Sequence, residues 1–305
     1  MAGFRRRKLA GRLLAALLLG GMADAAAADA PKRPQRIVSI NYCTDQLLLR
    51  LVEPERIASL TFLSWAPGDT PQEYLPVLKR VKPNHGLAEE VLRMNPDLVV
   101  SGTFSPHFTN DLLRHLGRTI HVFEAEDSFE DWYQRVLDLG EAVGEPERAK
   151  KMVADFKEGL AALEAQIPPG EKPVFAKLEV NNMMPGKDTF YTQLVNAGGF
   201  RTAGEAMGYS GYQTIPLEKL IQIDVALISS DRKYERPPSI ATQNLHHPLL
   251  RRMVEKAYAS IEIPPRYTLC TTPETLKMIA QLVEARKDID AAKAKRDAAG
   301  ASAPR

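Results

Sequence analysis

The chain has 305 residues, of which 44% are hydrophobic, 7% aromatic and 26% charged, and its formal net charge is +2. These fractions are ordinary for a soluble globular protein, and the length allows one large core or two modest ones. The charge excludes a nucleic-acid binder, because the chain without its first 28 residues holds 35 basic and 37 acidic side chains, a net charge of −2.

Residues 1–28 have the pattern of a cleavable signal peptide. Basic residues from Arg5 to Lys8 precede a short Leu/Ala stretch, and small residues follow it. The apolar stretch is too short to anchor the chain in a bilayer, so we expect export to the periplasm with cleavage near Ala28 or Ala30. The arginine run leaves twin-arginine export open beside the general route. No cysteine lies at the cleavage region, so no lipid anchor is expected.

Short apolar strands alternate with helical stretches over residues 35–126. The expected strands are 36–40, 56–60, 97–101 and 119–123, and the leucines between them are spaced as in helices. Strands separated by helices pair in parallel through right-handed crossovers. This pattern predicts an N-terminal α/β lobe.

Residues 127–167 are almost entirely helical in pattern, with one interruption at Gly144. Ser128 can cap the first helix with Asp131 in the capping-box position, and Pro146 suits the first turn of the second. The second helix, of about 21 residues, is about 30 Å long at the usual rise. It is long enough to join two lobes rigidly.

A second α/β pattern occupies residues 171–286. Strands are expected at 173–180, 224–230 and 258–263, and helices at 189–198 and after Pro273. Residues 287–305 are rich in alanine, and we expect a flexible tail there. The fold class predicted is therefore α/β, with two Rossmann-like lobes of mainly parallel sheets joined by a long rigid helix.

Aromatic and polar residues gather where the predicted strands end. Ligands of open parallel sheets bind beyond these ends, and aromatic rings suit a bulky, flat ligand. The alternative for each ring is that it fills the core beneath its loop. The expected apolar walls are Tyr42, Trp65, Phe104 and Tyr212, and the expected polar contacts are Asn41, Asn84, Ser229 and Arg232.

The two cysteines, Cys43 and Cys270, lie far apart in the sequence. Two separate buried thiols are the default expectation, and the oxidising periplasm leaves a disulfide open. Cys43 at a helix N-terminus also leaves open a secreted thiol enzyme. No hydrolase, zinc-protease or phosphate-loop motif is present, so no catalytic or metal-binding residue is expected. The adjacent His246 and His247 suit the start of a helix before Pro248 better than a metal site.

The chain resembles the periplasmic ferric-siderophore and vitamin B12-binding proteins over residues 35–286. The resemblance rests on "RIVSINYCTDQLLLRLVEPERIASL", "HGLAEEVLRMNPDLVVSGTF" and "GYSGYQTIPLEKLIQIDVALI". It implies two lobes bridged by a rigid helix, in a monomer that delivers a metal chelate to the permease dimer of an ABC importer in the inner membrane. It also implies that Glu89 and Glu218 dock to that permease.

The ligand implied by the resemblance is cobalamin, another corrinoid or a ferric siderophore, with no resident cofactor. Tyr42, Trp65 and Tyr212 match positions where B12 binders place aromatic rings, although Tyr212 replaces a usual tryptophan. A heme-binding member of the family is an alternative, with Tyr42 or His85 as the iron ligand. A binding protein that serves a sensory receptor is another alternative. The cysteines do not match the pair of the B12 binders.

Overall fold

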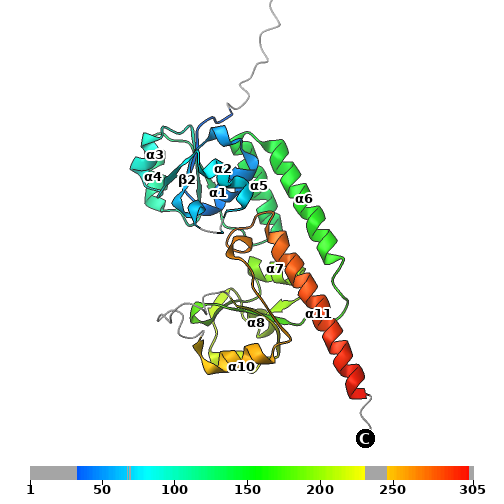
Figure 1. Cartoon of the computed structure of the whole chain (residues 1–305). Helices are drawn as coiled ribbons and strands as arrows, with labels where there is room; N and C mark the ends of the chain where they lie inside the picture. The colour runs from blue at the N-terminus through cyan, green and yellow to red at the C-terminus, as the bar shows by residue number, and fades with distance from the viewer. Residues whose placement is uncertain (1–32, 67, 69, 231–245, 302–305) are drawn as a thin grey trace, which may run out of the picture. The chain divides into compact units, whose positions relative to one another are not determined.

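The structure is a computed structural model that describes residues 33–66, 68, 70–230 and 246–301. The described elements belong to one compact unit, Pro34–Arg305, and Figure 1 traces their course. The predicted signal peptide, residues 1–28, and the predicted contact Arg232 lie outside the described residues. Among the helices that are described, none combines the length and apolar composition that a membrane crossing requires.

Five parallel strands form the first sheet in the order β3-β2-β1-β4-β5. They are β1 (Ile37–Ser39), β2 (Ile57–Thr61), β3 (Lys82–Asn84), β4 (Leu98–Gly102) and β5 (Ile120–Phe123). The four strands expected from the sequence are present. The additional strand, β3, reads Lys-Pro-Asn and lacks an apolar run. Its proline is tolerated because β3 is an edge strand.

Helix α1 (Tyr42–Leu51) follows β1 directly, and Asn41 makes this sharp turn possible. The Asn41 Oδ1 atom accepts hydrogen bonds from the backbone N–H groups of Cys43 (2.9 Å) and Thr44 (3.3 Å). Such a cap satisfies N–H groups that a helix start leaves free. Gly102 at the end of β4 makes room, since a Cβ atom there would lie 2.6 Å from Asn41 Nδ2. The lobe also contains α2 (Leu75–Leu78), α3 (Ala88–Arg93) and α4 (His107–His115).

Helices α5 (Phe129–Val143) and α6 (Pro146–Glu164) follow the first sheet. Ser128 caps α5 as expected, accepting from Asp131 N at 3.1 Å, and Gly144 ends it in the left-handed conformation with φ 71°. The 19 residues of α6 give a length of about 28 Å. Trp132 of α5 packs on Phe156 of α6, with ring centroids 4.5 Å apart, in the main core.

The second lobe has a four-stranded parallel sheet in the order β11-β10-β6-β8. Its strands are β6 (Val174–Leu178), β8 (Arg201–Thr202), β10 (Val225–Ser230) and β11 (Ala259–Ile261). A separate antiparallel pair joins β7 (Met183–Pro185) to β9 (Tyr212–Thr214). Three of these strands, β7, β8 and β9, are two or three residues long and were not expected. The helices are α7 (Phe190–Ala197), α8 (Ala203–Ala206), α9 (Leu217–Leu220) and α10 (Pro248–Lys256).

The expected flexible tail from residue 287 is wrong, because α11 (Thr275–Ala301) continues through it. Ile289 is 1% exposed, and the buried Arg286 bonds to Asp290 Oδ2 (2.8 Å) and to the Gly199 carbonyl (2.8 Å). Alanine also favours helix. α11 lies beside α6 (Figure 1), and Gly159 of α6 allows this approach, since a Cβ atom there would lie 2.7 Å from Leu276 Cδ1.

Replacing Ile289 with alanine tests whether residues beyond 286 belong to the fold. We expect Ile289→Ala to lower the free energy of unfolding by about 2–4 kcal/mol, because it leaves a cavity in the core. Urea denaturation followed by circular dichroism measures the change. Lys295→Ala, at an exposed position of the same helix, is the control and should change little. Equal stability of the two variants would contradict the packing of α11.

Candidate ligand-binding site

Large apolar side chains are exposed where the strands of the first sheet end. A 3₁₀ helix, Phe62–Trp65, follows β2 directly, and we call it the aromatic turn. Phe62 is 48% and Trp65 36% exposed, and Phe104, which follows β4, is 87% exposed. Since parallel strands end at the same edge of their sheet, these rings share one edge. Their exposure contradicts the alternative that they fill the core.

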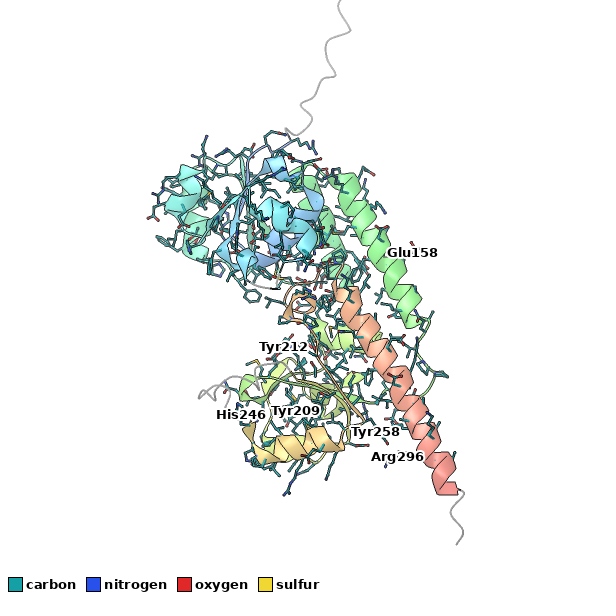
Figure 2. All side chains as sticks on the ribbon, in the orientation of Figure 1. Glu158, Tyr209, Tyr212, His246, Tyr258 and Arg296 are labelled. Carbon is teal, nitrogen blue, oxygen red and sulfur yellow. A yellow bond between two sulfur atoms is a disulfide. The ribbon has the colours of Figure 1, made fainter. Side chains whose placement is uncertain are left out.

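Tyr212 provides an exposed ring in the second lobe. It opens β9 (Figure 2) and is 61% exposed. Partial burial, together with the negative charge of Glu179, raises the pKa of Tyr212 above its ordinary value. Tyr42 differs from the other predicted rings, because it is only 9% exposed in the first turn of α1. Its ring is therefore mostly core, and it offers little surface to a ligand.

Two of the predicted polar contacts are buried inside their lobes. Asn84 is 0% exposed, and its Nδ2 donates to Ser39 O (2.9 Å), Ser59 Oγ (2.8 Å) and Leu60 O (3.0 Å). Its Oδ1 accepts from Gly86 N at 3.0 Å, so its hydrogen-bonding capacity is used within the protein. Ser229 in β10 is 4% exposed. The expectation that these two side chains contact a ligand is wrong, because both are enclosed by the ends of neighbouring strands.

Asn41 has a structural role that the sequence did not identify. Its side chain caps α1, and its Nδ2 lies against Gly102. The cap fixes the start of the helix at the strand-end edge, so Asn41 acts on the site by holding its scaffold.

The two predicted docking carboxylates are exposed. Glu89 lies in the first turn of α3 and Glu218 in the first turn of α9, one in each lobe. In the described part of the chain, neither forms an ion pair. Both therefore remain accessible to a partner of opposite charge.

Cys43 and Cys270 form a disulfide, with an S–S distance of 2.05 Å and Cα atoms 5.2 Å apart. The default expectation of two separate thiols is wrong. The two residues are 227 positions apart, and only the fold brings them together. The thiol-enzyme alternative fails for the same reason, since no cysteine is free to act as a nucleophile.

The disulfide belongs to a segment that returns from the second lobe to the first. This return segment, residues 262–274, runs from the end of β11 to the start of α11. Trp132 Nε1 donates to Thr271 O (2.9 Å), Arg266 Nη1 donates to Gly68 O (3.2 Å), and Glu274 forms a buried ion pair with Arg50 of α1. The lobes are therefore joined by this segment as well as by the helical region expected from the sequence.

The aromatic turn is hydrogen-bonded to a buried carboxyl group. Asp45 in the first turn of α1 is 0% exposed, and its Oδ2 accepts from Thr61 N (2.9 Å), Thr61 Oγ1 (2.6 Å) and Ser64 Oγ (2.8 Å). Burial raises the pKa of Asp45 to about 7, and the hydroxyls of Ser39, Thr61 and Ser64 together with the Thr61 amide lower it only in part. The sequence pattern marked Asp45 only as a helix-start residue.

Further exposed apolar side chains lie near the strand ends and were not among the predicted contacts, and they include Phe62, Met183 and Phe108. Phe62 stacks on His85 with ring centroids 4.9 Å apart. Met183 starts β7 and is 47% exposed, and Phe108 in the first turn of α4 is 79% exposed. Position after a strand could have indicated Phe62 and Met183. Phe108 follows a loop of several residues, so the strand-end rule misses it.

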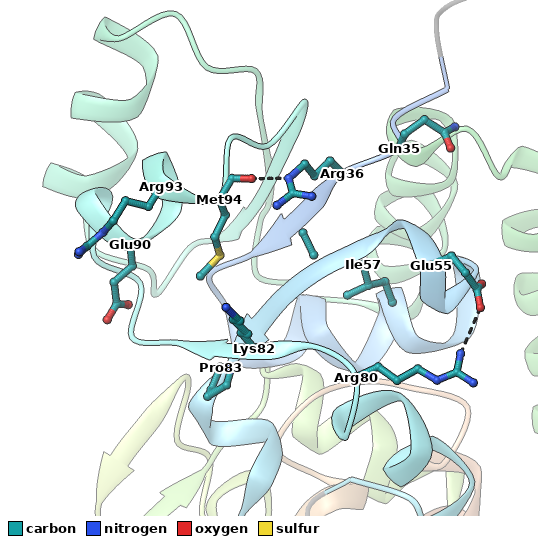
Figure 3. Close-up of a pocket in the computed structure, with 11 residues that line it drawn as sticks. Gln35, Arg36, Glu55, Ile57, Arg80, Lys82, Pro83, Glu90, Arg93 and Met94 are labelled. Carbon is teal, nitrogen blue, oxygen red and sulfur yellow. Dashed lines mark hydrogen bonds and ion pairs between the residues drawn. The ribbon is translucent and has the colours of Figure 1, made fainter.

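The amino-terminal edge of the first sheet has a cavity of 520 Å³ (Figure 3). Arg36, Arg80, Lys82 and Arg93 give it a basic lining, and Arg80 pairs with Glu55 at 3.2 Å. The cavity lies at the opposite ends of the strands from the exposed rings. This cavity is therefore not the ligand-binding site predicted from the sequence, which lies at the carboxyl ends of the strands.

Metal-binding side chains do not cluster in the described residues, where no three of His, Cys, Asp and Glu could hold a metal ion. His247 caps α10, and its Nδ1 accepts from Leu249 N at 3.2 Å. The expectation of a helix start at this histidine pair is confirmed.

Residues 37–247 match the family model described as periplasmic binding protein. The chain belongs to the periplasmic binding protein family. This membership confirms the sequence-based resemblance, and it confirms a binding role in place of catalysis, because the proteins of this family bind ligands and are not enzymes.

Relatives of this periplasmic binding protein occur among bacterial uptake proteins. An uncharacterized ABC transporter substrate-binding lipoprotein of Bacillus subtilis is 25% identical over 72% of this chain and 78% of its own length. The iron-uptake system-binding protein of Bacillus subtilis is 23% identical over 54% of this chain. The chain spans only 53% of the length of that second relative.

Solved structures share the fold. The periplasmic heme-binding protein of Roseiflexus sp. RS-1 has a TM-score of 0.67 at 19% identity, covering 84% of this chain and 98% of its own. The periplasmic vitamin B12-binding protein of Vibrio cholerae has a TM-score of 0.62 at 15% identity, covering 85% and 98%. These likenesses confirm the α/β fold with parallel sheets.

Removal of the disulfide tests the contribution of the return segment to stability. We expect Cys43→Ser with Cys270→Ser to lower the free energy of unfolding by about 2–4 kcal/mol, because the cross-link restricts the unfolded chain. Guanidinium denaturation measures the change. Wild-type protein denatured with a reducing agent should match the double variant, and no effect of reduction would contradict the bond.

Proposed function

We propose that the protein is the substrate-binding subunit of an ABC importer and captures a bulky metal chelate of the corrinoid, ferric siderophore or heme class. The observation that carries this proposal is the set of exposed apolar side chains beyond the ends of parallel strands. Such side chains are normally buried, and a group of them at the place where α/β proteins bind ligands favours a large ligand with apolar faces. The names of two relatives, an ABC transporter substrate-binding lipoprotein and an iron-uptake system-binding protein, support the role in import.

The walls of the site would be Phe62, Trp65, Phe104 and Tyr212. Each ring contributes contact area with few rotatable bonds, which limits the entropy lost on binding. With Asn84 and Ser229 buried, polar recognition has to come from other groups. Arg266 of the return segment is one candidate, and its guanidinium lies over the Tyr267 ring at 4.8 Å from the centroid. Arg232 remains a prediction outside the described residues.

Delivery would use the exposed carboxylates. Glu89 and Glu218 lie in matching places, the first turns of short helices in the two lobes. We infer that they pair with basic side chains of the permease, so that the permease contacts both lobes at the same time. The signal peptide would direct the chain to the periplasm, where it would act as a monomer.

Titration with cyanocobalamin, hemin and a panel of ferric siderophores tests the ligand class. We expect at least one chelate to bind, and we expect Trp65→Ala and Phe104→Ala each to weaken that binding by about 1–3 kcal/mol through loss of buried ring area. Isothermal calorimetry or absorbance change measures the affinity. Tyr258→Ala, an exposed ring beside α11, is the control and should keep the affinity. Failure of the whole panel would contradict the proposal.

Charge reversal tests the docking role. In Glu89→Arg with Glu218→Arg, we expect unchanged affinity for the chelate and a large loss of uptake into cells or permease-containing vesicles, because like charges would then meet. Glu158→Arg, at an exposed position of α6 (Figure 2), is the matched control and should transport normally. Loss of chelate affinity in the double variant would show instead that these carboxylates act in the ligand site.

A further inference from the structure

The aromatic turn depends on two neighbouring residues of α1 for its position. Asp45 Oδ2 receives three hydrogen bonds, two from Thr61 and one from Ser64 Oγ. Gln46 Nε2 donates to Thr70 Oγ1 (3.1 Å), and that hydroxyl donates to Ser64 O (2.8 Å). Ser64 is therefore held on its side chain by Asp45 and on its carbonyl through Thr70. Trp65, the next residue, carries an exposed ring.

The surroundings of Asp45 contain no compensating charge among the groups that face it. These groups are the hydroxyls of Ser39, Thr61 and Ser64 and the backbone N–H of Thr61. The Oδ1 atom accepts no hydrogen bond from the described residues, because the Ser39 hydroxyl that faces the carboxyl group donates to Asn41 O at 3.0 Å instead. A buried carboxylate with one oxygen unsatisfied carries a desolvation penalty, which protonation removes. The titratable group beside the turn itself is His85, which stacks on Phe62 and pairs with Glu90.

We propose that Asp45 is a positioning residue for the aromatic turn and that its ionisation loosens this turn. In the proton-bound form the carboxyl group keeps its place beneath Thr61 and Ser64. After ionisation, contact with water lowers the free energy of the carboxylate. Water can reach this buried group only if the turn moves away from it. A crevice of 380 Å³, lined by Ser64, Trp65 and residues of the following segment up to Lys79, adjoins the turn. The effect on ligand capture rests on the proposed function. The movement of the turn itself is independent of that function.

The direction of the pH effect follows from linkage. Burial raises the pKa of Asp45 from its ordinary 3.8 to about 7, whereas a hydrated carboxyl in the loosened state keeps the ordinary value. Between these values the closed state holds one more proton than the loosened state, so rising pH favours loosening. The stabilisation is complete below pH 3.8 and is lost as the pH rises through about 7.

The two tryptophans make the turn observable without a ligand. Trp132 is 0% exposed in α5, and Trp132→Phe leaves Trp65 as the sole tryptophan reporter. Acrylamide quenching of this ligand-free variant should increase as the pH rises from 4 to 8.5, with a midpoint below about 7 and a plateau above it, together with a red shift of emission. Circular dichroism at both pH values checks that the variant stays folded. Flat quenching across this range would overturn the proposal.

Variants in the same background identify the group that titrates. Asp45→Asn should abolish the transition. Ser64→Ala should move the transition to lower pH, because it removes one of the hydrogen bonds that hold the closed turn. Asp97→Asn, whose carboxylate binds the backbone of Gln35 and Arg36 elsewhere in the lobe, and His85→Gln should keep the transition. A transition that survives in Asp45→Asn, or disappears in His85→Gln, would overturn the assignment.

The ligand readout separates this inference from the function proposed above. Whichever chelate of the panel binds, wild-type affinity should fall from pH 6 to pH 8, and the affinity of Asp45→Asn should change less. If no chelate binds while the Trp65 transition is present, the proposed function fails and the positioning role stands. If a chelate binds with the same affinity at both pH values and quenching is flat, the positioning role fails alone.

Discussion

Parallel pairing of β1 with β2 and β4 is the constraint on which the rest of the first lobe depends. Parallel strands need crossovers, and the crossovers bring every carboxyl end to one edge of the sheet. The segments that follow β1, β2 and β4 therefore meet there, although 60 residues separate Ile37 from its partner Leu98 and more than that separates Asn41 from Phe104. The second sheet repeats this arrangement with β6, β10 and β11. The parallel topology alone therefore brings these segments together at one edge of the sheet, whichever side chains they carry.

Side chains at this edge divide into two groups with different roles. One group faces inward and bonds to backbone groups that the ends of strands and helices leave free, and it consists of Asn41, Asp45 and Asn84. Phe62, Trp65 and Phe104 turn outward. The inward group gives the outward group fixed positions, because an aromatic loop without such support would lose entropy on meeting a ligand. In these two groups the polar side chains face inward and the aromatic rings face outward, and Tyr42, a ring that is only 9% exposed, is the exception.

Much of this architecture could be predicted from residue patterns. Apolar strands alternating with leucine-spaced helices predicted the parallel lobes, and Ser128, Gly144 and Pro146 marked the helix ends. β3 was not predictable, since Lys-Pro-Asn has no strand pattern and is held by pairing with β2. Ile289 was overlooked because a single apolar residue among alanines gives little periodicity, although the fold supplies a partner surface. At the strand ends, the sequence identified which residues gather but gave no information on which of them face inward.

The disulfide makes a closed covalent ring of the chain between Cys43 and Cys270, which are 227 positions apart. Most of both lobes lies inside this ring. A single proteolytic cut at any peptide bond within it opens the ring without dividing the molecule, so neither lobe can diffuse away while the sulfurs stay oxidised. In a compartment that contains proteases, the bond therefore gives the protein a tolerance to nicking that non-covalent packing between the lobes does not provide.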